Sequence, residues 1–214
     1  MKESDKVPHL KKPLVYTKSA LGSPDRVILC INGYQGTAVE ILRFVSGLKI
    51  PELALAAVEA DDLSWFPRGV DEPRREKEPE FSAAIERVDK AVEEIKEIGF
   101  SAEKIHFLGF SQGACLALEY VLKKGGPWGG VFALAGCFVG AKEEVSSLSS
   151  DLQETPIFLG SGDLDELIPI DRVRLSSEVA EKAGALVTLS VYQGVGHKIN
   201  KDEAEYIKTF FTEN

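Results

Sequence analysis

Ser111 stands at the centre of a G-x-S-x-G frame formed by residues 109–113. An apolar run of strand type, Ile105 to Leu108, precedes this frame, and a strong helix-forming segment follows it. A serine on a tight strand-to-helix turn holds its Oγ clear of the sheet, and the flanking glycines avoid Cβ collisions with the adjoining strand and helix. The pattern therefore predicts a nucleophilic serine for acyl transfer, with the backbone N–H of Gln112 facing the oxyanion.

A serine nucleophile needs a general base, and the chain contains three histidines. His106 lies inside the expected elbow strand, where a packed core side chain is the simplest interpretation, and His9 lies in a polar segment. His197 follows two closely spaced glycines after the apolar run Leu186 to Tyr192. Because such a strand-end loop lets an imidazole reach over the sheet, His197 is the predicted base.

The base in turn needs an orienting carboxylate, which α/β-hydrolases carry between the serine and the histidine. Asp163 and Asp165 both follow the apolar run Pro156 to Leu159 and precede Pro169. Either carboxylate could reach the imidazole from the end of that strand, and the other would then serve as a turn or cap residue. Spacing alone does not separate the two.

Apolar strand-like runs alternate with amphipathic helix patterns along the whole chain. This alternation predicts an α/β fold with a mainly parallel sheet, helices on both faces, and functional groups beyond the carboxyl ends of the strands. No repeat or domain boundary appears, so residues 1–214 are expected to form a single domain, with residues 1–12 loosely ordered. The expected strands are 26–31, 53–58, 105–108, 130–136, 156–159 and 186–192, with an edge strand at 13–18; the expected helices are 37–48, 81–98, 114–124, 171–183 and 201–211.

Composition and charge narrow the functional classes. A hydrophobic content of 44% and a charged content of 28% are typical of a soluble globular protein. The net charge of −9 argues against nucleic-acid binding, and no apolar run is long enough for an integral membrane segment. The first residues lack the apolar core of a secretory signal, so a cytoplasmic location is expected.

Three cysteines, Cys30, Cys115 and Cys137, lie in apolar surroundings. Their odd number and their setting favour buried free thiols in a reducing compartment over a disulfide framework. Cys115 is expected to pack under the elbow. No Cys/His spacing indicates a metal site, and the predicted chemistry needs no cofactor.

The motifs GFSQGA, GDLDELIP and GVGH, which begin at Gly109, Gly162 and Gly194, together resemble the phospholipase/carboxylesterase family of α/β-hydrolases, which includes acyl-protein thioesterases. The resemblance covers about residues 26 to 212 and implies a compact α/β-hydrolase domain without a large lid. In that family the acid is the aspartate four positions before the proline. The resemblance therefore selects Asp165 and leaves Asp163 as a turn or support residue.

A second oxyanion donor is expected from the loop after the first buried strand. By resemblance it is the backbone N–H of Tyr34. The family usually has His-Gly where this chain has Asn32-Gly33, and Asn-Gly is also a common turn pair.

Three aromatic side chains are candidate substrate-binding walls, although aromatic residues often belong to a core instead. Trp65 and Phe66 resemble the W-[YF]-P segment of small carboxylesterases, and Phe138 follows the strand expected at 130–136. The charged cluster from Arg74 to Glu80 is interpreted as a solvated face.

The leading functional hypothesis is a serine carboxylesterase acting on short- to medium-chain esters through an acyl-enzyme. The alternative is an acyl-protein thioesterase or lysophospholipase, which would require an elongated apolar groove. A non-catalytic binding module on the hydrolase fold is the third reading, and loss of a triad member would be its signature. The expected partner is a small-molecule ester, and the resemblance makes a homodimer a possible assembly.

Overall fold

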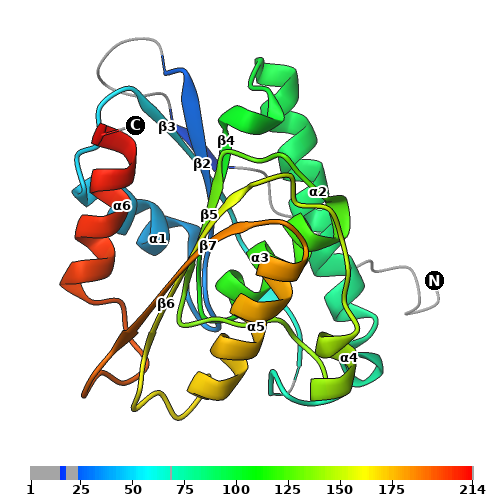
Figure 1. Ribbon diagram of the computed structural model, residues 1–214. Helices are drawn as coiled ribbons and strands as arrows, with labels where there is room; N and C mark the ends of the chain where they lie inside the picture. Colours follow the sequence, from blue (N-terminus) through cyan, green and yellow to red (C-terminus); the bar gives the residue numbers. More distant parts are fainter. Residues whose placement is uncertain (1–14, 18–23, 68, 214) are drawn as a thin grey trace, which may run out of the picture.

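A seven-stranded sheet forms the centre of the protein, in the order β1-β3-β2-β4-β5-β6-β7 (Figure 1). The computed structural model describes residues 15–17, 24–67 and 69–213. Six strands run parallel, and β1 alone is antiparallel, paired with β3. The strands are β1 (Val15–Thr17), β2 (Arg26–Ile31), β3 (Leu53–Val58), β4 (Ile105–Phe110), β5 (Gly130–Leu134), β6 (Pro156–Gly162) and β7 (Leu186–Tyr192). The predicted parallel sheet is confirmed, and β1 lies at the edge where a strand was expected.

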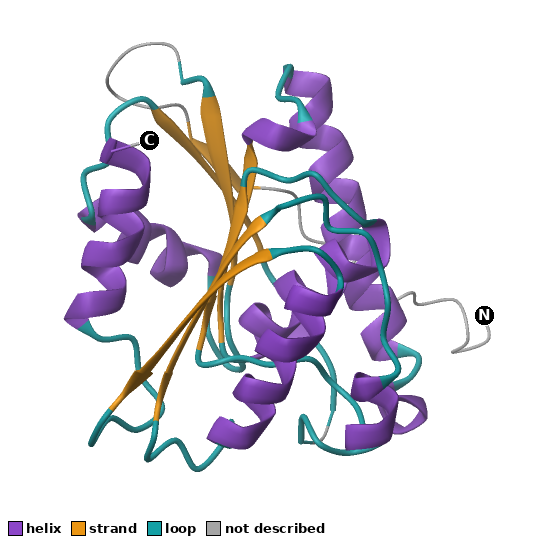
Figure 2. Cartoon of the chain, viewed as in Figure 1, coloured by secondary structure: helices purple, strands orange, loops and turns teal. Residues whose placement is uncertain are grey.

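Helices cover both faces of this sheet, as Figure 2 shows. Helices α1 and α6 lie on one face, and α2, α3 and α5 lie on the other. The α/β architecture predicted from the sequence, with helices on both faces of the sheet, is therefore confirmed. The helices are α1 (Ala38–Gly47), α2 (Glu80–Ile98), α3 (Gln112–Lys124), α4 (Lys142–Ser146), α5 (Ile170–Lys182) and α6 (Lys201–Glu213).

Local sequence signals set the helix ends. Thr37 caps α1: its hydroxyl accepts the N–H of Glu40, and the Glu40 carboxylate accepts the N–H of Thr37 at 2.8 Å. This reciprocal capping box satisfies two N–H groups that the helix itself leaves unpaired. Gly99 ends α2 in a left-handed conformation, with φ at 116°.

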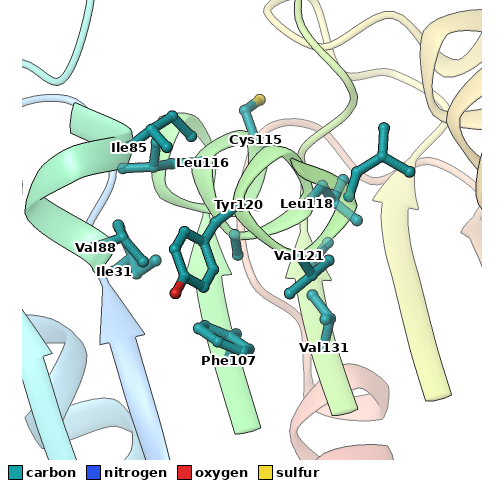
Figure 3. Packing of buried hydrophobic residues seen from close by; sticks show 14 of the residues in the cluster. Ile31, Ile85, Val88, Phe107, Cys115, Leu116, Leu118, Tyr120, Val121 and Val131 are labelled. Carbon is teal, nitrogen blue, oxygen red and sulfur yellow. The ribbon is translucent and has the colours of Figure 1, made fainter. Parts of the chain in front are cut away.

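Helix α3 packs its apolar side chains between α2 and the central strands (Figure 3). Tyr120 lies against Phe107 of β4 with ring centroids 5.5 Å apart, and its hydroxyl donates to Asp89 of α2 at 3.0 Å. Burying a large apolar side chain stabilises a fold by about 1.5–3 kcal/mol, so this layer holds α3, and with it the elbow, against the sheet.

His106 and the cysteines are core residues, as predicted. His106 is buried against Phe210 and Phe211 of α6, and burial lowers its pKa to about 4. All three cysteines are free and buried. In the described ranges no cluster of three or more His, Cys, Asp or Glu side chains is placed to hold a metal ion. No helix among these residues combines the length and apolar character that a bilayer span requires.

The charged cluster from Arg74 to Glu80 is not a fully solvated face, which corrects the interpretation made from the sequence. Lys77 is fully buried and donates to the carbonyl of Glu72 at 3.0 Å, and burial lowers its pKa. Arg74 forms an ion pair with buried Glu119 of α3. Glu119 lies 45 residues from Arg74 in the sequence, so the local pattern of charges could not reveal this pair.

The closest backbone approach at the elbow yields a stability test. A Cβ on Gly113 would overlap the carbonyl oxygen of Ile31, whereas a Cβ on Gly47 would meet no atom within 4 Å. We expect Gly113→Ala to lower the free energy of unfolding by about 2 kcal/mol or more, because backbone atoms must move apart. Gly47→Ala, the matched control, should raise it by up to about 1 kcal/mol through helix propensity. Urea unfolding measures both, and equal effects would contradict this account.

Candidate active site

Ser111 occupies a strained turn between β4 and α3. Its φ of 55° and ψ of −123° lie outside the regions that a side chain normally allows. Its N–H donates to the carbonyl of Leu134 in the neighbouring strand at 2.9 Å. A Cβ on Gly109 would overlap the backbone of Gly113. The two glycines of the motif thus serve the purpose that the sequence indicated: they let the strand and helix meet closely enough to form the turn.

Hydrogen bonds join Ser111, His197 and Asp165 in one line. The His197 Nε2 lies 2.9 Å from the Ser111 Oγ, and its Nδ1 lies 2.8 Å from the Asp165 Oδ2. The second oxygen of Asp165 accepts the N–H groups of Leu167 and Ile168, each at 2.9 Å. Because a carboxylate only accepts hydrogen bonds, the proton of the neutral ring belongs on Nδ1, which leaves Nε2 free to accept from the serine.

Asp163 lies on the same loop but has a different partner. Its Oδ1 accepts the N–H of Gly194 at 2.7 Å, in the loop that carries His197. The two loops also meet where the N–H of Leu164 donates to the carbonyl of Val195 at 3.0 Å. The structure therefore places Asp165 against the imidazole and Asp163 as a support between the two loops.

The segments that carry the two predicted oxyanion donors adjoin the serine. Gln112 is the first residue of α3, so its N–H has no acceptor within the helix. Gly33 adjoins the nucleophile closely: a Cβ added there would lie 3.2 Å from the Ser111 Cβ. The loop that carries Tyr34 therefore lies beside Ser111, and the Asn32 amide closes it by donating to the carbonyls of Gly33 and Gly36.

The side chains of Trp65, Phe66 and Phe138 are buried in the core and do not form a substrate surface, which corrects the expectation. All three side chains are at most 1% exposed. Phe66 packs edge-on against Phe81 of α2, at a centroid distance of 5.5 Å. A side chain without exposed surface cannot contact a substrate in this conformation, so these three residues belong to the core.

Two exposed leucines lie in the loop that carries Asp165, and the sequence analysis did not single them out. Leu164 and Leu167 flank Asp165 and are 63% and 65% exposed, and the Tyr34 side chain is 58% exposed. The ring of Phe110 lies 4.9 Å from the His197 ring. The available signal was two leucines in a strand-end loop that is otherwise polar.

A buried carboxylate lies at the start of α6, just beyond the His197 loop. The Glu203 side chain is 1% exposed and accepts the N–H of Asn200 at 2.8 Å. Asn200 in turn accepts the N–H of Glu203, which completes the cap of the helix. Burial raises the pKa of Glu203 to about 7, since removal from water disfavours the charged form.

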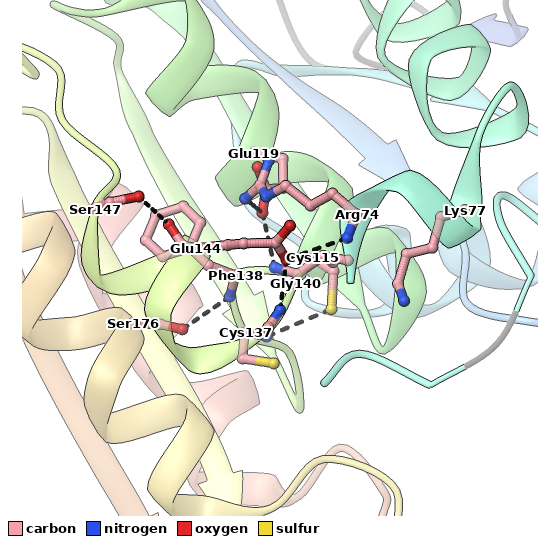
Figure 4. Close-up of polar contacts among 12 residues, drawn as sticks. Arg74, Lys77, Cys115, Glu119, Cys137, Phe138, Gly140, Glu144, Ser147 and Ser176 are labelled. Carbon is pink, nitrogen blue, oxygen red and sulfur yellow. Dashed lines mark hydrogen bonds and ion pairs between the residues drawn. The ribbon is translucent and has the colours of Figure 1, made fainter. Parts of the chain in front are cut away.

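A second buried carboxylate, that of Glu119, links α3 to the segments that carry Arg74 and Val139 (Figure 4). The Glu119 Oε1 accepts from Arg74 at 2.6 Å and from the N–H of Val139 at 2.7 Å. Burial raises the pKa of Glu119, and the Arg74 charge acts in the opposite direction. Arg74 and Glu119 also line a cavity of about 320 Å³ between α2 and α3. Ser111, His197 and Asp165 are not among the residues that line this cavity.

The family is established by a match to the phospholipase/carboxylesterase model over residues 43–214. The chain therefore belongs to this family of α/β-hydrolases, as the motifs indicated. An acyl-protein thioesterase 1 of Kluyveromyces lactis is 30% identical over 135 residues, which cover 62% of this chain and 59% of that protein. A probable carboxylesterase SOBER1-like protein of Arabidopsis thaliana is 24% identical over 165 residues, which cover 77% of this chain and 57% of that protein.

Solved structures agree with the fold. A phospholipase/carboxylesterase from Dyadobacter fermentans superposes with a TM-score of 0.87 at 32% identity, covering 94% of this chain and 96% of that one. The esterase PE8 superposes at 0.79 with 22% identity, over 93% and 97% of the two chains, and that likeness shows the fold alone. The matches to the two curated relatives span less than three fifths of the length of each.

The raised pKa of Glu203 makes stability depend on pH. Between the ordinary value of 4.5 and about 7, the folded protein holds a proton that the unfolded chain releases, so stability falls as pH rises through this window. Glu203→Gln removes this titration and keeps an acceptor for the Asn200 N–H. We expect the free energy of unfolding of the variant, relative to wild type, to increase by up to about 3 kcal/mol between about pH 4.5 and about pH 8. Urea unfolding at several pH values measures the difference, and a constant difference would contradict the assignment.

Proposed function

We propose that this protein is a serine carboxylesterase that hydrolyses short- to medium-chain esters through an acyl-enzyme. The observation that carries the proposal is the unbroken hydrogen-bond line from Ser111 through His197 to Asp165. These residues come from three separate loops at the carboxyl ends of β4, β6 and β7. Such a line is the arrangement that makes a serine hydroxyl nucleophilic.

In the first half of the reaction, the Ser111 Oγ attacks the ester carbonyl while His197 Nε2 takes the hydroxyl proton. A bond forms between Oγ and the carbonyl carbon, and the carbonyl oxygen gains a negative charge. Collapse of this intermediate breaks the bond to the alcohol oxygen, and the imidazolium returns its proton to the leaving alcohol. Asp165 keeps the ring oriented and stabilises its charged form.

In the second half, water attacks the acyl-enzyme, with His197 again as the base. The new intermediate expels the Ser111 oxygen, which regains a proton from the imidazolium, and the carboxylic acid leaves. In both halves the N–H groups of Tyr34 and Gln112 are proposed to hold the oxyanion. One such donor can contribute about 3–4 kcal/mol to stabilisation of the transition state.

The apolar side chains beside the triad support an ester whose acyl or alcohol part is apolar. Leu164 and Leu167 present exposed surface in the loop that carries Asp165. Apolar groups that a substrate covers gain about 25 cal/mol per Å² removed from water. A domain without a large lid would leave the site shallow, which favours short- to medium-chain groups over long ones.

An acyl-protein thioesterase or lysophospholipase is the second candidate. The name of the Kluyveromyces lactis relative favours the thioesterase reading, and the same three residues would serve it. The unbroken hydrogen bonds from Ser111 through His197 to Asp165 argue against a non-catalytic binding module. The cytoplasmic location and the homodimer stay predictions, and light scattering of the purified protein tests the assembly.

Substitution of the two neighbouring aspartates tests the mechanism. Asp165→Asn should lower kcat about 10³- to 10⁴-fold, because an amide no longer selects the correct imidazole tautomer. Asp163→Asn should keep kcat within about 3-fold, since the new carbonyl can still accept the Gly194 N–H. Ser111→Ala should abolish turnover. Hydrolysis of p-nitrophenyl acetate, butyrate and octanoate measures all three.

Two results would overturn the proposal. Equal losses in the two aspartate variants would remove Asp165 from its role. Turnover that survives in Ser111→Ala would exclude the acyl-enzyme. A wild-type preference for a long-chain ester, such as p-nitrophenyl palmitate, or for acyl thioesters would instead favour the second candidate.

The exposed leucines give a test of substrate contact. The double variant Leu164→Ser, Leu167→Ser should raise KM for the octanoate ester about 5-fold and leave KM for the acetate within about 2-fold, because only the longer chain loses apolar contact. Leu186→Ser is the matched control: Leu186 is 59% exposed but starts β7, at the opposite end of the sheet. If the control changes KM as much as the double variant does, the leucines are not substrate contacts.

A further inference from the structure

The side chain of Gln112 ties the nucleophile elbow to the segment around Trp65. Its Oε1 accepts the backbone N–H of Trp65 at 3.1 Å, and its Nε2 donates to the carbonyl of Phe66 at 2.9 Å. Gln112 therefore has two separate roles: its backbone N–H is a proposed oxyanion donor, and its side chain holds the neighbouring segment.

The same segment holds the loop of the second proposed donor. The indole N–H of Trp65 donates to the carbonyl of Asn32 at 2.8 Å. The N–H of Gln35 donates to the carbonyl of Leu63 at 2.7 Å. Tyr34 lies between Asn32 and Gln35 in the chain, so hydrogen bonds to the segment 63–66 fix its loop before and after Tyr34.

Within that loop, the Asn32 side chain completes the closure. Its Nδ2 donates to the carbonyls of Gly33 and Gly36 at 2.9 and 2.8 Å, and the Gly36 N–H donates to the Gly33 carbonyl at 3.1 Å. The bonds form a continuous path from the Gln112 side chain through Trp65 to Asn32 and the loop that carries Tyr34.

The spacing of the two donors matters because an oxyanion hole works only when both N–H groups lie within hydrogen-bond distance of one oxygen. The adjacent strands β2 and β4 set this spacing coarsely, with Ile31 beside Gly109. Both donors lie beyond the strand ends, where the sheet no longer holds them. Supporting contacts must therefore fix them to a fraction of an ångström.

We propose that Trp65 is a positioning residue that fixes the distance between the two oxyanion donors, with its indole N–H on the Asn32 side and its backbone N–H on the Gln112 side. The inference rests on the proposed function, and it gives Trp65 a role that its complete burial allows. Because the Trp65 indole is completely buried, water cannot take the place of its N–H. Removal of this N–H therefore leaves the Asn32 carbonyl without this donor.

Trp65→Phe tests the proposal, because it keeps an aromatic ring and removes the indole N–H. Trp128→Phe is the matched control: Trp128 is also buried, and its indole N–H donates to the Gly125 carbonyl, beyond the far end of α3. Activity is measured as kcat and KM for p-nitrophenyl butyrate, per serine titrated with a fluorophosphonate, so that unfolded protein does not count.

We expect Trp65→Phe to lower kcat about 10-fold, with KM within about 2-fold and the acid limb of the pH profile unmoved, since His197 and Asp165 keep their contacts. Trp128→Phe should keep kcat within about 2-fold. Gln112→Met removes the other attachment without removing the backbone N–H, and it should also lower kcat. It carries the test if Trp65→Phe does not fold.

Unchanged kcat in Trp65→Phe, or an equal loss in Trp128→Phe, would overturn the positioning role. A raised KM with unchanged kcat would instead make Trp65 a substrate contact. If wild type hydrolyses no ester or thioester, the proposed function fails on its own. The rate of fluorophosphonate labelling, which also builds charge on an oxygen beside Ser111, then decides the role of Trp65 by the same comparison of variants.

Discussion

The structure depends most on the close backbone approach at the nucleophile elbow. Ser111 can hold a φ of 55° because β4, the first turn of α3 and the end of β2 pack together without intervening Cβ atoms. The strain at this residue persists only because its surroundings leave no other conformation open. The apolar packing of α3 and the ion pair at Glu119 both hold the helix in this position.

The parallel sheet brings the three reacting side chains to one edge. Strands β4, β6 and β7 end at the same side of the sheet, so loops from distant parts of the sequence meet there. The end of β6 and the loop after β7 also approach each other closely. A Cβ on Gly162, the last residue of β6, would overlap the carbonyl of Val195. The sheet sets the approximate distances, and contacts between loops refine them.

Buried polar groups surround the site on several sides. Asn32, Glu119 and Glu203 are each at most 4% exposed, and each holds backbone groups of a loop or a helix end. A buried polar group is costly unless it is hydrogen-bonded, so it favours one loop conformation over alternatives that would leave it unpaired. These residues therefore explain why irregular segments around Ser111 have a defined shape.

The sequence by itself determined the features that depend on neighbours along the chain. The alternation of strands and helices, the elbow around Ser111, the cap at Thr37 and the loop position of His197 are local patterns with local causes. The choice of Asp165 over Asp163 required the family resemblance, because both aspartates have the same local setting.

Tertiary structure alone decided the burial or exposure of several side chains around the site. Trp65 bonds to a carbonyl 33 residues away and lies in the core, whereas Leu164 and Leu167 stand in solvent beside the triad. Arg74 is paired across 45 residues with Glu119. Burial depends on which distant segments meet, and residue type alone does not specify that, so an aromatic residue expected at the substrate site lies in the core instead.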